Sequence, residues 1–85
     1  MTLTLTAVRR IASDVAQQEQ PAVDVVGVTP REGSSTSAEV VFAIRECHNE
    51  PCRVVVGVSR QVSEAECRGA VRTQLRKRLS TRSGN

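Results

Sequence analysis

Residues 38–58 read AEVVFAIRECHNEPCRVVVGV, and this stretch decides the fold. It holds two segments rich in β-branched and other apolar residues, Ala38–Glu46 and Arg53–Val58, separated by a polar connection that contains Pro51. Segments of this composition and length are typical of strands. The short connection between them predicts an antiparallel hairpin.

The register of this hairpin follows from the residues that share a face. One face of the first strand carries Val40, Phe42 and Ile44, and one face of the second carries Val54, Val56 and Val58. Both sets are buried together only if paired residues have equal parity, which disfavours a register that pairs Cys47 with Cys52. Because the Pro51 ring excludes the left-handed conformation that a three-residue loop needs, we expect a five-residue loop, Cys47–Pro51, or a bulge.

The chain on the N-terminal side of the hairpin predicts one helix and one strand. Apolar residues recur at helical spacing at Val8, Ile11, Ala12, Val15 and Ala16. We expect this helix to begin near Leu5, with Thr4 or Thr6 as N-cap, and to end before Pro21, although residues 2–6 also alternate like a short strand. The valine-rich run Val23–Val28 then predicts a strand that is closed by a loop over residues 29–35.

The chain on the C-terminal side of the hairpin predicts a second helix. Ser63 and Glu66 form a capping box, and Val62 and Cys67 are placed as a hydrophobic staple. The apolar stripe of this helix comprises Cys67, Val71, Leu75 and Leu79. We expect the tail, residues 80–85, to fray.

The elements therefore follow in the order α-β-β-β-α within a single small domain, residues 1–85. This order predicts an α+β two-layer sandwich, with both helices on one face of a three-stranded antiparallel meander. The order resembles that of the double-stranded-RNA-binding domain. That family has lysines at the start of its last helix, where this chain has Ser63-Glu64-Ala65-Glu66, and a histidine in the first inter-strand loop, where residues 29–37 have none. We therefore carry over none of that family's activity.

The cysteines and the N-terminus favour a reducing compartment. The chain has three cysteines, no secretory signal and no apolar run of membrane-spanning length. We expect a cytoplasmic protein with reduced thiols and no membrane partner, in which a Cys47–Cys52 disulfide is disfavoured. The spacing of Cys47, His48, Cys52 and Cys67 matches no common zinc motif, so we expect no metal ion and no cofactor.

No catalytic residues are predicted. His48 is the only histidine and lies in a polar turn, and the glycines are isolated, so that no phosphate-binding loop is present. We expect the protein not to be an enzyme.

The last helix carries an excess of positive charge. Six basic and no acidic residues follow Glu66, whereas residues 1–66 contain six basic and nine acidic residues. Like charges at i,i+4 spacing destabilise a helix unless an anion compensates them. We therefore consider an acidic protein partner or nucleic-acid phosphate for the following residues: Arg68, Arg72, Arg76, Lys77 and Arg78. Cations that complement the helix dipole are the alternative explanation.

The face of the sheet opposite the helices is the second candidate surface. Val41, Ala43 and Val55 should point away from the helices, among charged side chains, as in an interaction surface. An 85-residue domain has a small core, so we expect a homodimer formed through this face or by edge-strand addition. The sequence thus favours a small, non-enzymatic, self-associating protein-interaction module, with a nucleic-acid-binding accessory protein as the alternative.

Overall fold

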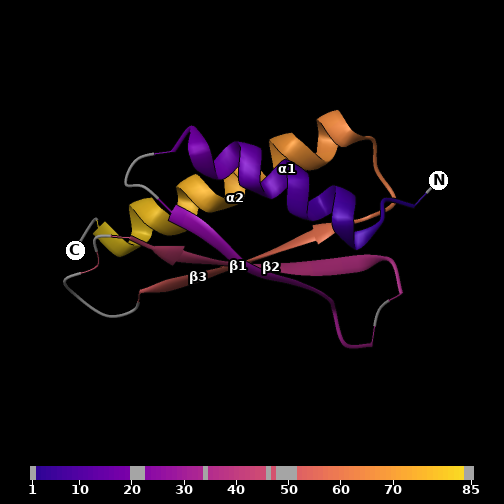
Figure 1. The fold of residues 1–85 in the computed structure, drawn as a ribbon, viewed down its shortest axis with the longest axis horizontal. Helices are drawn as coiled ribbons and strands as arrows, with labels where there is room; N and C mark the ends of the chain where they lie inside the picture. Colours follow the sequence, from indigo (N-terminus) through magenta and orange to yellow (C-terminus); the bar gives the residue numbers. More distant parts are fainter. Residues whose placement is uncertain (1, 20–22, 34, 46, 48–51, 84–85) are drawn as a thin grey trace.

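The computed structural model describes residues 2–19, 23–33, 35–45, 47 and 52–83. Five elements follow in the predicted order: α1 (Leu5–Gln17), β1 (Val23–Pro30), β2 (Ser37–Ile44), β3 (Arg53–Ser59) and α2 (Glu64–Ser83). The strands form an antiparallel sheet in the order β1-β2-β3. Both helices cover one face of this sheet (Figure 1). The predicted α+β two-layer sandwich is confirmed.

Both helices begin at the predicted caps. The Thr4 hydroxyl accepts a hydrogen bond from the Ala7 N–H at 3.1 Å, so Thr4 is the N-cap of α1. The Ser63 hydroxyl accepts a hydrogen bond from the Glu66 N–H at 3.1 Å and lies 3.3 Å from the Glu66 carboxylate, to which it donates. Helix α2 continues to Ser83, and the fraying of residues 80–85 stays a prediction.

The N-terminal segment before α1 is tied to the end of β3 and forms no strand. The Leu3 N–H donates to the Arg60 carbonyl at 2.7 Å, and the Arg60 guanidinium donates back to the Leu3 carbonyl at 2.8 Å. Of the two alternatives for residues 2–6, the start of a helix is therefore the one that forms.

The register of the β2–β3 hairpin has the predicted parity. Val40 pairs with Val56 and Phe42 with Val54, so both apolar sets face the helices. The predicted five-residue loop, Cys47–Pro51, is wrong. Such a loop would pair Glu46 with Cys52, whereas the Ile44 N–H donates to the Cys52 carbonyl at 2.9 Å. Strand β2 ends at Ile44, and the side chain of the next residue, Arg45, donates to Asp24 of β1. Residues 48–51 lie outside the described part of the chain.

The core lies between the helices and the inner face of the sheet. Phe42 is fully buried at its centre, and aliphatic side chains from all five elements surround it. Every residue of the two predicted apolar helix stripes is buried: Val8, Ile11, Ala12, Val15, Ala16, Cys67, Val71, Leu75 and Leu79. The helical periodicity in the sequence thus identifies the inner surface of both helices.

Candidate functional site

Three basic residues of α2, Arg68, Arg72 and Arg76, here called the arginine flank, contact side chains of α1 and of the two residues that follow it. Arg68 lies 3.6 Å from the Asp14 carboxylate, the Arg72 guanidinium donates to the Gln18 amide oxygen at 3.2 Å, and Arg76 donates to Glu19 at 2.8 Å. In the opposite sense, Arg10 of α1 donates to Glu64 of α2 at 2.5 Å. From one pair to the next, the residue numbers rise in both partners, so α1 and α2 run parallel.

The Glu19–Arg76 pair differs from the other three in burial. Glu19 follows the C-terminus of α1 and is only 5% exposed, whereas the Arg76 side chain is 63% exposed. A buried carboxylate without a partner costs several kcal/mol. Arg76 is therefore required by Glu19, and the Arg68–Asp14 pair, which is half exposed on both sides, contributes much less.

The compensation expected for the arginine flank is thus present within the chain. Asp14 of α1, and Gln18 and Glu19 directly after it, contact the three arginines for which a partner was considered, Arg68, Arg72 and Arg76. Lys77 and Arg78 are exposed on later turns of α2, where Arg78 lies beside the edge strand β3. Contacts of these five residues with phosphate or with an acidic protein stay a prediction.

The outer face of the sheet is the surface that the helices leave uncovered. In the register of the sheet, Val41 is opposite Gly27 on β1 and Val55 on β3, and Ala43 is opposite Asp24 and Arg53. Val41, Ala43 and Val55 alternate with residues that face the core, which places them together on the outer face. The three residues predicted for this face are therefore brought together by the fold.

Val26 belongs to the same surface and was missed from the sequence. The β1–β2 register shifts between Val25 and Gly27, which marks a β-bulge. Val26 is 45% exposed and Val55 is 41% exposed, and they are the large hydrophobic residues that stand out as exposed among the described residues. The glycine inside the valine run was the sequence signal, since an isolated glycine within a strand often indicates a bulge.

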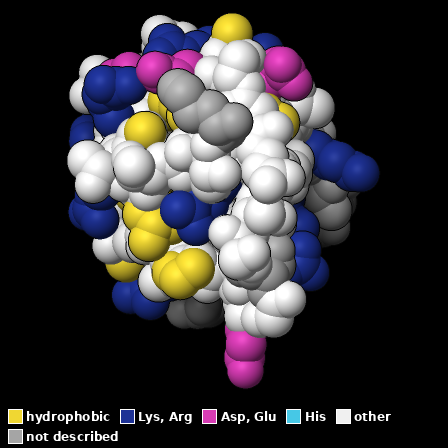
Figure 2. Space-filling model, turned by 90° about the vertical axis from the view of Figure 1, so that its right-hand side faces the viewer, with side chains coloured by type: hydrophobic (Ala, Val, Ile, Leu, Met, Phe, Trp, Pro, Cys, Tyr) yellow, Lys and Arg dark blue, Asp and Glu magenta, His cyan; other side chains and the backbone are white. Residues whose placement is uncertain are grey.

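Charged groups border this apolar row. The Arg45 guanidinium donates two hydrogen bonds to the Asp24 carboxylate, at 2.7 and 2.6 Å. The hydrogen bonding lowers the pKa of Asp24 and raises the pKa of Arg45. Figure 2 shows one end of the molecule, where a small group of exposed hydrophobic side chains lies beside Lys and Arg side chains.

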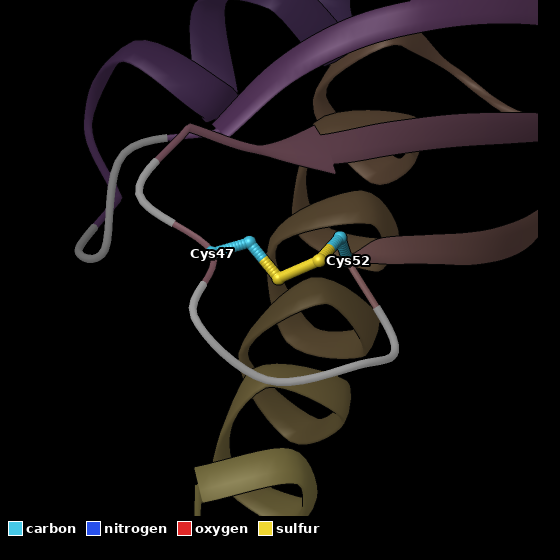
Figure 3. Close-up of a disulfide and its surroundings, with 2 residues drawn as sticks. All are labelled: Cys47 and Cys52. Carbon is cyan, nitrogen blue, oxygen red and sulfur yellow. A yellow bond between two sulfur atoms is a disulfide. The ribbon is translucent and has the colours of Figure 1, made fainter.

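Cys47 and Cys52 form a disulfide, so the prediction of reduced thiols is wrong for these two residues (Figure 3). The parity of the valines excluded the two cysteines as partners in the strand ladder, and they are not paired there. The connection between Ile44 and Arg53 nevertheless brings their Cα atoms within 5.6 Å, a separation that a disulfide spans. The parity of the valines restricts which residues pair in the strands, but it does not restrict contacts between residues outside the strands, such as these two cysteines.

Cys67 is the free cysteine and is buried in the core. Burial raises the pKa of its thiol, which makes it a poor nucleophile. The described residues contain no group of three His, Cys, Asp or Glu side chains placed to hold a metal ion. His48 lies outside this part of the chain.

Comparison with known proteins gives no relative from which a function could be transferred. No protein-family model, curated protein or solved structure matches this chain. Within the residues that the structure describes, neither helix has the length and apolar character needed to cross a bilayer. The two surfaces described above are therefore the basis for a functional proposal.

Proposed function

We propose that this protein is a small, non-enzymatic interaction module that self-associates through the outer face of its sheet. The observation that carries the proposal is the row formed by the paired residues Val41 and Val55 and by Val26, the bulge residue next to Gly27, which is opposite Val41. Val26 and Val55 expose 45% and 41% of their surface at the two ends of this row. An apolar centre with a charged border is the composition of a protein interface.

A second copy of the chain is the partner that this face fits best. Val41 is opposite Val55 on one side and Gly27, next to the bulge residue Val26, on the other, and in the next row Asp24 and Arg53 are opposite Ala43. A two-fold axis parallel to β2 would place Val26 on the partner's Val55 and Asp24 on the partner's Arg53. The apolar ends of the row then meet each other, and the Asp24 carboxylate, which already accepts from Arg45, lies opposite a second cation, in the self-complementary pattern of an isologous dimer.

The size of the domain and the state of its edge also support this face. A domain of 85 residues buries a limited apolar surface alone, so covering three valines adds stability. Edge-strand addition at β3 has less support, because the Gly57 carbonyl already accepts a hydrogen bond from the Gln74 side chain at 2.7 Å.

Sedimentation equilibrium tests the proposal. We expect a dimer for the unmodified protein and folded monomers for Val41→Glu and Val55→Glu, because each substitution would bury a charge in the interface. Gln17→Glu, at an exposed position of α1, is the matched control and should remain dimeric. A monomeric unmodified protein, or glutamate variants that still dimerise, would reject the proposal.

Adding a short fluorescent duplex to the same experiment separates the nucleic-acid alternative. Phosphate binding by the arginine flank would have to compete with Gln18 and Glu19, which Arg72 and Arg76 already contact. We therefore expect the duplex to sediment unchanged. A duplex that sediments with the protein at low salt but not at physiological salt, and is released by Arg72→Glu and Arg76→Glu, would support the alternative instead.

A further inference from the structure

A hollow of about 330 Å³ opens where the outer face of the sheet meets the edge strand β3. Its lining comes from the end of β1, from β2 and β3, and from the outward side of α2, whose side chains reach around the edge. The lining residues are Arg31, Glu39, Val55, Gly57, Gln74 and Arg78. The hollow adjoins the valine row at Val55 and lies apart from the α1–α2 ion pairs.

Gly57 leaves open space on the β3 side of the hollow. It occupies an outward-facing position of β3, opposite Glu39, and a Cβ atom built on it would meet no atom within 4 Å. The wall beside it is fixed, because the Gln74 side chain donates to the Gly57 carbonyl at 2.7 Å. A larger side chain at position 57 would therefore extend into this space.

Two arginines at the hollow lack the partners that other arginines have. Arg10, Arg45, Arg68 and Arg76 each form an ion pair. Among the described residues, Arg9, Arg31, Arg53 and Arg78 have neither an ion pair nor a side-chain hydrogen bond, and two of these four, Arg31 and Arg78, line the hollow together with one carboxylate, Glu39. The lining thus has a net charge of +1, and its two guanidinium groups present planar donor pairs that match an oxyanion.

We propose that this hollow binds a small molecule that carries a carboxylate or phosphate group. Arg31 and Arg78 hold the oxyanion, and Val55 contacts the carbon portion of the ligand. The volume, near the lower end of the range for ligand sites, admits a molecule larger than a bare anion. Glu39 accepts a hydrogen bond from a hydroxyl or ammonium group next to the oxyanion. This site goes beyond self-association. It shares Val55 with the proposed dimer face, so a ligand that contacts Val55 competes there with the second copy.

Isothermal titration with inorganic phosphate, succinate and phosphoserine tests the site. We expect phosphoserine to bind most tightly, because it alone offers both an oxyanion and a donor for Glu39. Gly57→Val should abolish binding without unfolding the protein, since valine favours strands and enters open space. Arg78→Gln and Arg31→Gln should each weaken binding about 10-fold or more. Arg9→Gln, an exposed arginine of α1 outside the hollow, is the matched control and should leave binding unchanged.

Three results would overturn the proposal. They are no binding of any of the three probes up to about 10 mM, binding that persists in Gly57→Val, and equal weakening by Arg9→Gln, which would indicate attraction to net charge alone. Phosphoserine binding that strengthens in Glu39→Gln would reject the role of Glu39. Sedimentation of the same samples reports self-association separately, so failure of this site is distinguishable from failure of the dimer.

Discussion

The two faces of the sheet use the same residue type for different purposes. On the inner face, which the helices cover, Val40 and Val56 are fully buried. On the outer face, Val55, which precedes Val56 in β3 and pairs with Val41, leaves 41% of its surface exposed. Strand alternation thus assigns neighbouring valines either to the stability of the fold or to a surface that a partner can cover.

The difference between the two faces is tested most directly by comparing how much an inner and an outer substitution lower the free energy of unfolding. We expect Phe42→Ala to lower the free energy of unfolding by about 3–5 kcal/mol, because it leaves a cavity at the centre of the core. This loss is comparable to the total stability of a small domain. Val55→Thr, which keeps β-branching on the exposed face, should cost less than about 1 kcal/mol.

Urea unfolding followed by circular dichroism measures both effects. If Phe42→Ala does not fold, Phe42→Leu provides a milder inner substitution, expected to cost about 1–2 kcal/mol. Equal midpoints for the inner and outer variants would show that the two faces contribute alike. The assignment of the outer valines to a partner would then lose its basis.

The disulfide sharpens the comparison, because it crosslinks the β2–β3 hairpin without belonging to either face. Replacing Cys47 and Cys52 by serine should lower the free energy of unfolding by about 2 kcal/mol, the entropy expected for closing a six-residue loop. Dimerisation should persist, since the valine row is unchanged. Thermal unfolding with and without reductant checks the first effect, and an unchanged midpoint would contradict it. Cys67→Ser should not reproduce any response to reductant.

The ion pairs between the helices test whether burial decides the importance of a charge. Arg76→Gln should cost about 1–3 kcal/mol, because Glu19 remains buried without its cation. Arg68→Gln, which removes the half-exposed pair with Asp14, should cost less than about 1 kcal/mol. Urea midpoints for the two variants give the contrast, and equal losses would show that Glu19 is not special.

The smallest expected effect concerns the charged border of the outer face. Arg45 lowers the pKa of Asp24, so this pair contributes stability above about pH 4, the ordinary aspartate range, and loses it as the pH falls through the lowered pKa. Asp24→Asn should therefore be slightly less stable than the unmodified protein at pH 7, with the difference vanishing in acid. Urea midpoints across pH 2–7 measure this, and a constant difference would refute the linkage.

Local signals in the sequence predicted much of the fold. The hydroxyl of Thr4 and the Ser63–Glu66 box identify where the helices begin, because capping requires particular side chains next to the first turn. The equal parity of Phe42 and Val54 in the hairpin follows from burial of one face. These features depend on residues that are close in sequence or on strict alternation.

The features that sequence reasoning missed depend on tertiary geometry. The bulge at Val26 requires the register of two strands, and the Cys47–Cys52 disulfide requires the path of a loop. The like charges of the arginine flank suggested a partner outside the chain. Its partner on α1 became visible only when two distant helices were placed side by side.

The parallel arrangement of α1 and α2 also has a kinetic consequence. The Arg10–Glu64 and Arg72–Gln18 contacts each join residues 54 positions apart, with the whole meander between them. Contact between the helices closes a loop of more than 50 residues, so the entropy of that loop opposes the contact until the intervening strands are ordered. Chains dominated by such distant contacts fold slowly for their size, on a scale of roughly milliseconds to seconds. Docking of the two helices is thus expected as a late event, and the inner valines stay accessible to solvent until it occurs.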